Sequence, residues 1–149
     1  MNTKLERNDA VKILMDMLIP IAYQRVIRGL EALLVDGPPG RKPAEENIAL
    51  HKWYQQLDTQ SQAHVQAIVQ KAVGSTIFSF LTMLDRAAGG PPLEGVESDF
   101  ALYLQAYENM DAEALDQPTI RVKLNAWSAT EPLHDMFRWA LEEQGVTLK

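Results

Sequence analysis

Three histidines are the side chains best suited to chemistry in this chain of 149 residues. Neutral imidazole binds divalent metal ions and exchanges protons near neutral pH. His51, His64 and His134 fall on three different predicted helices, and helical bundles build metal sites from side chains on facing helices. One hypothesis is therefore a metal site formed by these three histidines, in an enzyme that acts on a small molecule.

A bundle with a histidine on its second helix and further histidines on its last helix resembles the DinB-like group of metal-dependent proteins. The last helix of that group carries two histidines one turn apart, whereas the residue four positions after His134 is Arg138. A cation at that position repels a divalent metal. Gln62 and Gln66 flank His64, which indicates a solvated face. We therefore favour structural or surface histidines and expect no cofactor.

A second candidate site combines the end of one predicted helix with the start of another. Asp85 and Arg86 end the long central segment, and His134 and Asp135 begin the last helix. In an antiparallel bundle these ends meet, and the four side chains form a polar cluster. The alternative is that each charge acts on its own helix, with Arg86 stabilising a C-terminus and Asp135 an N-terminus.

Other catalytic motifs are absent from the sequence. The segment from Gly37 to Lys42 lacks the length and the Ser/Thr of a phosphate-binding loop, and it follows a helix where that loop requires a strand. Ser75 falls in mid-helix, where a hydroxyl bonds a backbone carbonyl more often than it attacks a substrate. The chain has no cysteine, so thiolate nucleophiles and disulfides are excluded. We expect a protein that is not an enzyme.

The net charge of -6 is concentrated in the second half of the chain, because residues 1–75 contribute +1 and residues 76–149 contribute -7. An acidic surface repels nucleic acid and attracts a basic protein partner. The alternatives are that acidic loops only keep the protein soluble and that the tryptophan of the last helix packs at the rim of the core. The predicted partner-binding residues are Glu94, Glu97, Glu108, Asp111, Glu113 and Trp139.

A helix over residues 59–89 is the predicted centre of the fold. After Gly74, large apolar residues point in every direction around the axis, so the second half is predicted to lie inside the core. Gly74, Ser75 and Ser79 form a stripe of small side chains that lets a helix approach closely, either from this chain or from a second copy in a homodimer. The residues that recur every three or four positions predict one buried face: Val65, Ile68, Val69, Ala72, Val73, Thr76, Ile77, Phe80 and Leu84.

Two helices precede this central helix. The first begins at Asn8 or Asp9 and ends at residues 36–40, with a kink or a junction of two helices at Pro20. The second covers residues 43–57. Its predicted buried face is Leu50, Trp53, Tyr54 and Leu57, which leaves His51 and Ile48 on the opposite side.

The second half of the chain adds strands and a last helix over residues 130–145. The predicted buried face of this helix is Leu133, Met136, Phe137, Ala140 and Leu141. Residues 119–126 alternate apolar and polar side chains, which predicts a half-buried strand. Residues 99–107 fit strand and helix spacing equally, and we favour a strand because a lone strand needs a partner for its backbone groups. The predicted fold is a single α+β domain, residues 1–149: a mostly helical bundle of about four helices with a small two-stranded antiparallel sheet. The alternative is an all-α fold.

Three segments resemble short uncharacterised bacterial proteins that end in a strand, a Leu-Asn pair and a helix opening with Leu-His-Asp: Phe80 to Asp85, Leu124-Asn125 and Pro132 to Arg138. Some small acidic bacterial proteins of this kind act as immunity or accessory partners, so the resemblance implies a binding role and no catalytic residue. We also expect a cytoplasmic location, because no export signal is recognisable and the apolar run Ile13 to Ala22 is too short to span a bilayer.

Overall fold

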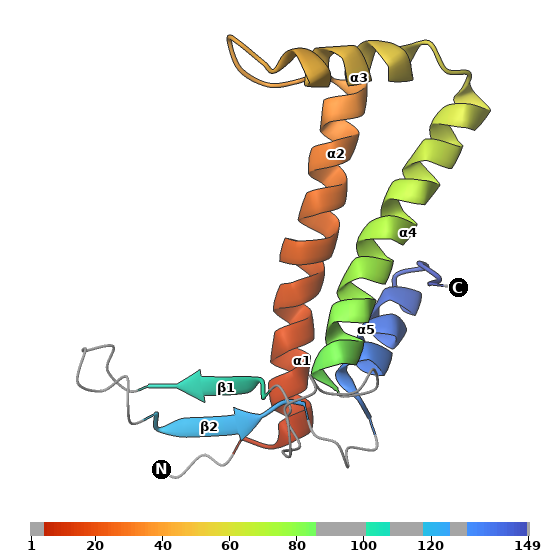
Figure 1. The fold of residues 1–149 in the computed structure, drawn as a ribbon. Coiled ribbons are helices and arrows are strands. Elements are labelled where there is room, and N and C mark those ends of the chain that lie inside the picture. Colours follow the sequence, from red (N-terminus) through yellow and green to blue (C-terminus); the bar gives the residue numbers. More distant parts are fainter. Residues whose placement is uncertain (1–4, 86–100, 108–117, 126–130, 149) are drawn as a thin grey trace, which may run out of the picture. The chain divides into compact units, whose positions relative to one another are not determined.

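The computed structural model describes residues 5–85, 101–107, 118–125 and 131–148 (Figure 1). Within these residues the fold is α+β and mostly helical, with a two-stranded antiparallel sheet, as the sequence predicts. The elements in chain order are α1 (Arg7–Leu18), the π-helical turn η1 (Ile19–Gln24), α2 (Arg25–Val35), α3 (Glu45–Gln55), α4 (Thr59–Leu84), β1 (Tyr103–Ala106), β2 (Ile120–Lys123) and α5 (Leu133–Glu142).

The chain divides into two compact units. Unit 1 consists of Met1–Met17, Phe78–Thr147 and Lys149, and unit 2 of Leu18–Ile77 and Leu148. Whether these units together make the single domain that the sequence predicts stays a prediction.

Pro20 lies inside the π-helical turn η1, and the helix is not broken there. The flanking residues Leu18 and Arg25 both have helical backbone angles, with φ of -63° and -65°. Proline has no N–H to donate, and its ring clashes with the carbonyl of the preceding turn in a regular α-helix. The wider π turn accommodates both defects. Two α-helices, α1 and α2, therefore meet at a π turn that contains Pro20, where the sequence predicts a kink or a junction of two helices.

The sheet confirms the strand predicted for residues 99–107 and its antiparallel pairing with residues 119–126, over shorter spans. Leu104 pairs with Val122 in the register, and Tyr103 pairs with Lys123. The guanidinium carbon of Arg121 lies 4.2 Å from the centre of the Tyr103 ring, a cation–π contact between diagonal neighbours of the two strands.

The core of unit 1 is formed by α1, the end of α4, Leu124 after β2, and one face of α5. Leu133, Phe137 and Leu141 follow one another at four-residue steps along α5 and are all fully buried, together with Val11 of α1. The buried face predicted for the last helix is therefore confirmed at these three positions.

In unit 2, α3 lies across the ends of α2 and α4 (Figure 1), and it turns a different face to them than the sequence predicts. Tyr54 is buried, but Leu50 and Trp53 are exposed, whereas His51 is half-buried. The His51 ring and the Gln55 side-chain amide both bond to the Leu34 carbonyl of the last turn of α2, at 2.8 and 3.2 Å. The last carbonyls of a helix have no hydrogen-bond partner within the helix. Bonding of His51 and Gln55 to the Leu34 carbonyl therefore determines which face of α3 turns toward α2, more than the apolar pattern of α3 does.

The helix α4 is also less buried than predicted. Leu81 and Leu84 are buried, but Phe80 is 55% exposed, so the prediction that the second half of this helix is enclosed on all sides is wrong. In the first half Ile68 is 66% exposed, although it belongs to the predicted buried face. The predicted end at Gly89 lies outside the described residues. Asp58 caps the start, since its Oδ1 accepts a hydrogen bond from the Ser61 backbone N–H at 2.8 Å.

Candidate functional site

The carboxylate of Asp85, directly after α4, contacts the first turn of α5. Its Oδ2 accepts hydrogen bonds from the His134 backbone N–H at 3.0 Å and from the His134 ring Nδ1 at 2.9 Å. The first N–H groups of a helix have no internal partner, and no side chain of α5 itself caps its N-terminus at Pro132. Asp85 supplies the missing acceptor from a distant part of the chain.

The His134 ring is held on its other sides as well. Its Nε2 lies 3.8 Å from Oδ2 of Asp135, which pairs through Oδ1 with Arg138 at 2.6 Å. The Phe78 ring meets the imidazole edge-on, with ring centres 5.3 Å apart. Because Asp85 is an acceptor, we assign the proton to Nδ1. The structure thus brings together Asp85, His134 and Asp135 of the predicted polar cluster, while Arg86 lies outside the described residues.

Two residues that were not among the predicted site residues complete this region. Asn125 is buried; its side-chain amide donates to the Leu84 carbonyl, and its Oδ1 accepts from the Leu102 backbone N–H at 2.6 Å. Arg7 donates through Nε to the Leu124 carbonyl at 2.8 Å and through Nη2 to the Glu131 carbonyl at 2.9 Å. We call Arg7, Asp85, Asn125 and His134 the polar junction.

The polar junction joins the three segments on which the resemblance to small bacterial proteins depends, those containing Asp85, Asn125 and His134. Apart from the bond between the Asp85 and His134 side chains, each of the bonds described here satisfies a backbone group at or next to the end of a helix or strand. One signal in the sequence pointed to Asn125: the Leu124-Asn125 pair near the end of a predicted strand is part of the resemblance to small bacterial proteins. Nothing comparable pointed to Arg7.

In nucleophilic catalysis a histidine acts as the general base, and an aspartate that bonds to one ring nitrogen orients it. The other ring nitrogen then bonds to the hydroxyl or thiol of the nucleophile. In this structure the Asp135 carboxylate lies 3.8 Å from His134 Nε2. A carboxylate has no proton to give up when ionised. The geometry of the described part of the chain therefore supports a structural role for the pair.

The three histidines of the metal hypothesis have other surroundings. His51 bonds to the Leu34 carbonyl, His64 is exposed on α4, and His134 bonds to Asp85. In the part of the chain that the structure describes, no group of three or more His, Cys, Asp or Glu side chains is arranged to hold a metal ion.

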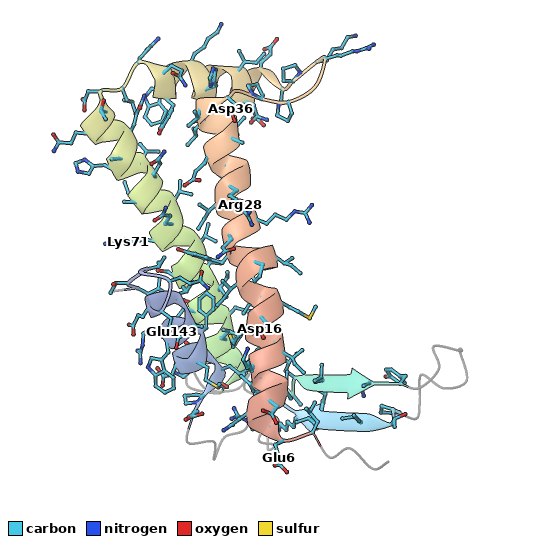
Figure 2. The ribbon with its side chains drawn as sticks, turned by 180° about the vertical axis from the view of Figure 1, so that it is seen from behind. Glu6, Asp16, Arg28, Asp36, Lys71 and Glu143 are labelled. Carbon is cyan, nitrogen blue, oxygen red and sulfur yellow. The ribbon has the colours of Figure 1, made fainter. Side chains whose placement is uncertain are left out.

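Trp139 is an exposed aromatic residue of α5 with acidic side chains close to it. Trp139 is 44% exposed, and its neighbours one turn away include Asp135, Glu142 and Glu143, of which the last two are exposed. Figure 2 shows Glu143 on α5 and Asp16 on α1. We call Trp139, Glu142 and Glu143 the acidic tryptophan surface. The other predicted partner-binding residues, Glu94, Glu97, Glu108, Asp111 and Glu113, lie outside the described residues.

The negative charge of Glu143 also acts on a residue of α1. Asp16 raises the pKa of the Lys12 ammonium above its ordinary value, chiefly through their 2.7 Å hydrogen bond, and the negative charge of Glu143 acts in the same direction. Glu143 is therefore close enough to α1 for its charge to act on Lys12.

Comparison of the chain with known protein families, with curated proteins and with solved structures finds no match.

Proposed function

We propose that this protein is a non-enzymatic binding protein that recognises a basic region of a protein partner through the acidic tryptophan surface of unit 1. The observation that carries this proposal is the exposure of Trp139 beside Glu142 and Glu143. Tryptophan is enriched among the few residues that supply most of the energy of protein interfaces. Surrounding carboxylates speed the encounter with a basic partner and disfavour acidic ones.

An immunity-like or regulatory role in the bacterial cytoplasm fits such a surface. Nucleic acid is a poor fit as the partner, because its phosphates are repelled by the same carboxylates. The absence of cysteine from the sequence suits a reducing compartment.

Binding tests of matched variants decide the proposal. The wild-type chain, Trp139→Ala and the double variant Glu142→Gln/Glu143→Gln are immobilised and exposed to lysate of the source cell, and each retained protein is quantified at low and high salt. We expect Trp139→Ala to weaken capture of the partner by roughly 30-fold or more, the size of an interface hot spot. The double variant weakens capture mainly at low salt, because salt screens the lost charges.

The matched control is Trp53→Ala, which removes an equally exposed tryptophan from α3 in unit 2. This variant is expected to keep the partner. If Trp139→Ala and Trp53→Ala retain the same proteins in the same amounts as the wild type, the acidic tryptophan surface is not the binding site.

A further inference from the structure

Two helical segments carry the chain from one compact unit to the other, and each has an irregular turn close to the boundary. Unit 2 runs from Leu18 to Ile77, with Leu148 added. The boundary at Leu18 lies next to the π turn η1, and the boundary at Ile77 lies within α4. The local structure of these two turns therefore decides how readily the helices bend there.

The π turn weakens the helical segment formed by α1, η1 and α2. Arg25 donates its backbone N–H to the carbonyl of Pro20, five residues earlier, whereas an α-helix bonds to the residue four earlier. Pro20 has no N–H of its own, so a further backbone bond is missing from this turn. Long helices bend at prolines and at π turns. The most deformable turn of this segment is therefore residues 19–24.

The helix α4 is weakened around Gly74. Glycine lowers the stability of a helix relative to alanine. The Thr76 hydroxyl donates to the Ala72 carbonyl at 2.8 Å, and side-chain bonds of this kind compete with the backbone ladder and bend helices. This bond joins the residues two positions before and two positions after Gly74, so both features act on one turn of α4.

The two weak turns lie side by side. A Cβ added to Gly74 would lie 3.4 Å from Cε2 of Tyr23, a residue of η1 that is only 3% exposed. Bending the helix pair at this level therefore deforms only the two turns that resist bending least.

The packing between the helices is also incomplete at this level. A groove with a volume of about 350 Å³ lies there, lined by six uncharged residues of η1, α2 and α4: Ala22, Val26, Ala72, Val73, Thr76 and Ile77. Gly74 lies on a different side of α4 from these residues. Close-packed protein interiors resist deformation, whereas the space of this groove lets side chains move when the helices bend.

Leu148 fills the notch that Gly74 leaves in α4. A Cβ at position 74 would lie 2.5 Å from Cδ2 of Leu148, closer than carbon atoms approach, so only glycine leaves room for this side chain. Leu148 follows α5 after Gly145, which has a positive φ of 79° and reverses the chain. The predicted close approach at Gly74 is therefore made by one leucine side chain of the same chain.

A membrane-spanning helix is the alternative explanation for Gly74, because glycine is frequent in such helices. Among the described helices α4 is the one that is long and apolar enough, by length and composition, to cross a membrane. Lys71 lies near its middle, where a charge is costly in a bilayer. Gln62 and Gln66 bond to the Tyr54 carbonyl and hydroxyl of α3. These polar groups favour the packing of Leu148 as the reason for the glycine.

We propose that the turns at Pro20 and Gly74 form a hinge in the helix pair and that Leu148 holds this hinge closed. While Leu148 fills the notch at Gly74, the helix pair keeps one conformation. When Leu148 leaves the notch, α2, α3 and the first half of α4 move as one piece about residues 19–24 and 72–76. Leu148 is half-buried, so leaving the notch costs less than exposing a fully buried leucine.

Distances between pairs of spin labels test the hinge, and the chain has no cysteine of its own to be labelled. The pair Asp9→Cys and Lys52→Cys spans the hinge, from α1 to α3. One control pair, Arg28→Cys and Lys52→Cys, lies within unit 2, and the other, Asp9→Cys and Gln144→Cys, lies within unit 1. All four positions are exposed. The distance distribution of the spanning pair is expected to be broader than those of both control pairs.

Variants of the two glycines and of Leu148 sharpen this test. Leu148→Ala is expected to raise the fraction of open molecules by roughly 10-fold, as the loss of a partly buried leucine implies. Gly74→Ala added to Leu148→Ala fits the emptied notch and strengthens α4, so it should narrow the distribution again. The matched control adds Gly29→Ala to Leu148→Ala. Its Cβ meets no atom of the chain within 4 Å, and it strengthens α2 away from the hinge, so the distribution should stay broad.

Amide exchange of the unlabelled wild type is a test that needs no variant. The amides of residues 74–78 should exchange faster than those of residues 65–69, which lie equally far from the other end of α4. Equal exchange in the two stretches, a spanning pair as narrow as the control pairs, a Leu148→Ala distribution no broader than the wild type, or equal narrowing by Gly29→Ala and Gly74→Ala would each overturn the proposal. None of these measurements involves a partner, so they leave the proposed function untouched.

Discussion

The two compact units differ in the size of the apolar core that each one closes. In unit 1 the α5 side chains Leu133, Phe137 and Leu141 are fully buried, and they close a core with Val11 and Leu124. In unit 2 five large side chains are buried, Ile19, Tyr23, Ile27, Leu34 and Tyr54, and six are exposed, Ile21, Val26, Val35, Leu50, Trp53 and Ile68. The larger closed core of the described residues therefore lies in unit 1, and removing a side chain from that core should cost the most stability.

The polar side chains of the two units differ in the groups to which they bond. In unit 1 the buried side chains of Asp85 and Asn125 bond to chain segments far away in the sequence. In unit 2 the polar side chains His51 and Gln62 bond mainly to backbone carbonyls of neighbouring helices. The bonds of unit 1 specify how its segments meet, and those of unit 2 satisfy helix ends.

The largest expected effect concerns the core of unit 1. Phe137→Ala removes a fully buried ring and should lower the free energy of unfolding by about 3–5 kcal/mol. Trp53→Ala removes a larger but exposed ring from unit 2 and should change it by less than about 0.5 kcal/mol. Urea unfolding followed by circular dichroism measures both. Equal losses for the two variants would show that the contrast between the units is mistaken.

The polar junction provides the next effect. Asp85→Ala removes the acceptor of two hydrogen bonds at the start of α5 and leaves the His134 N–H groups without it, so the expected loss is about 2–3 kcal/mol. The control Asp135→Ala removes a more exposed carboxylate of the same helix and should cost less than about 1 kcal/mol. Chemical denaturation measures both losses. A smaller loss for Asp85→Ala than for Asp135→Ala would mean that α5 is held by its apolar face alone.

The features that the sequence predicted are those set by local pattern. Alternation of side chains identified the strand containing Val122, and four-residue spacing identified the buried face of α5 at Phe137. The meeting of Asp85 with His134 followed from the order of the helices, since the end of one antiparallel helix lies near the start of the next. The acidic residues Glu142 and Glu143 were visible in the composition, but their position around Trp139 becomes evident only on the helix.

The features that the sequence did not predict depend on which element, if any, packs against a given helix face. The periodicity of α4 predicts a buried face that includes Ile68, but Ile68 is 66% exposed, because spacing shows which residues share a face and not whether anything covers it. Leu50 and Trp53 were predicted to be buried because they are apolar, but the carbonyl of Leu34 requires donors and draws His51 inward instead. Nor does any local pattern reveal that Leu148 lies beside Gly74.

A smaller effect is expected from Tyr23, a buried tyrosine of unit 2. Burial raises the pKa of the Tyr23 hydroxyl above its ordinary value. Its contribution to stability is therefore fully present below the unfolded pKa of about 10 and is lost as pH rises through the higher pKa of the folded state. The melting temperature of the wild type should fall more steeply above pH 10 than that of Tyr23→Phe. Parallel curves for the two proteins would show that this hydroxyl is as well solvated in the folded state as in the unfolded state.

The smallest effect is expected at the exposed start of α4, where Asp58 caps the helix. The hydrogen bonds from the Ser61 backbone N–H and hydroxyl lower the pKa of the Asp58 carboxyl. The stability that this group contributes is present above its unfolded pKa and is lost as pH falls through the lower pKa of the folded state. Amide exchange in the first turn of α4 should therefore quicken in acid for the wild type. In Asp58→Ala it should be fast already at neutral pH, with little change in global stability, because unit 1 holds the larger core. A large global loss in this variant would show instead that the start of α4 is coupled to the core of unit 1.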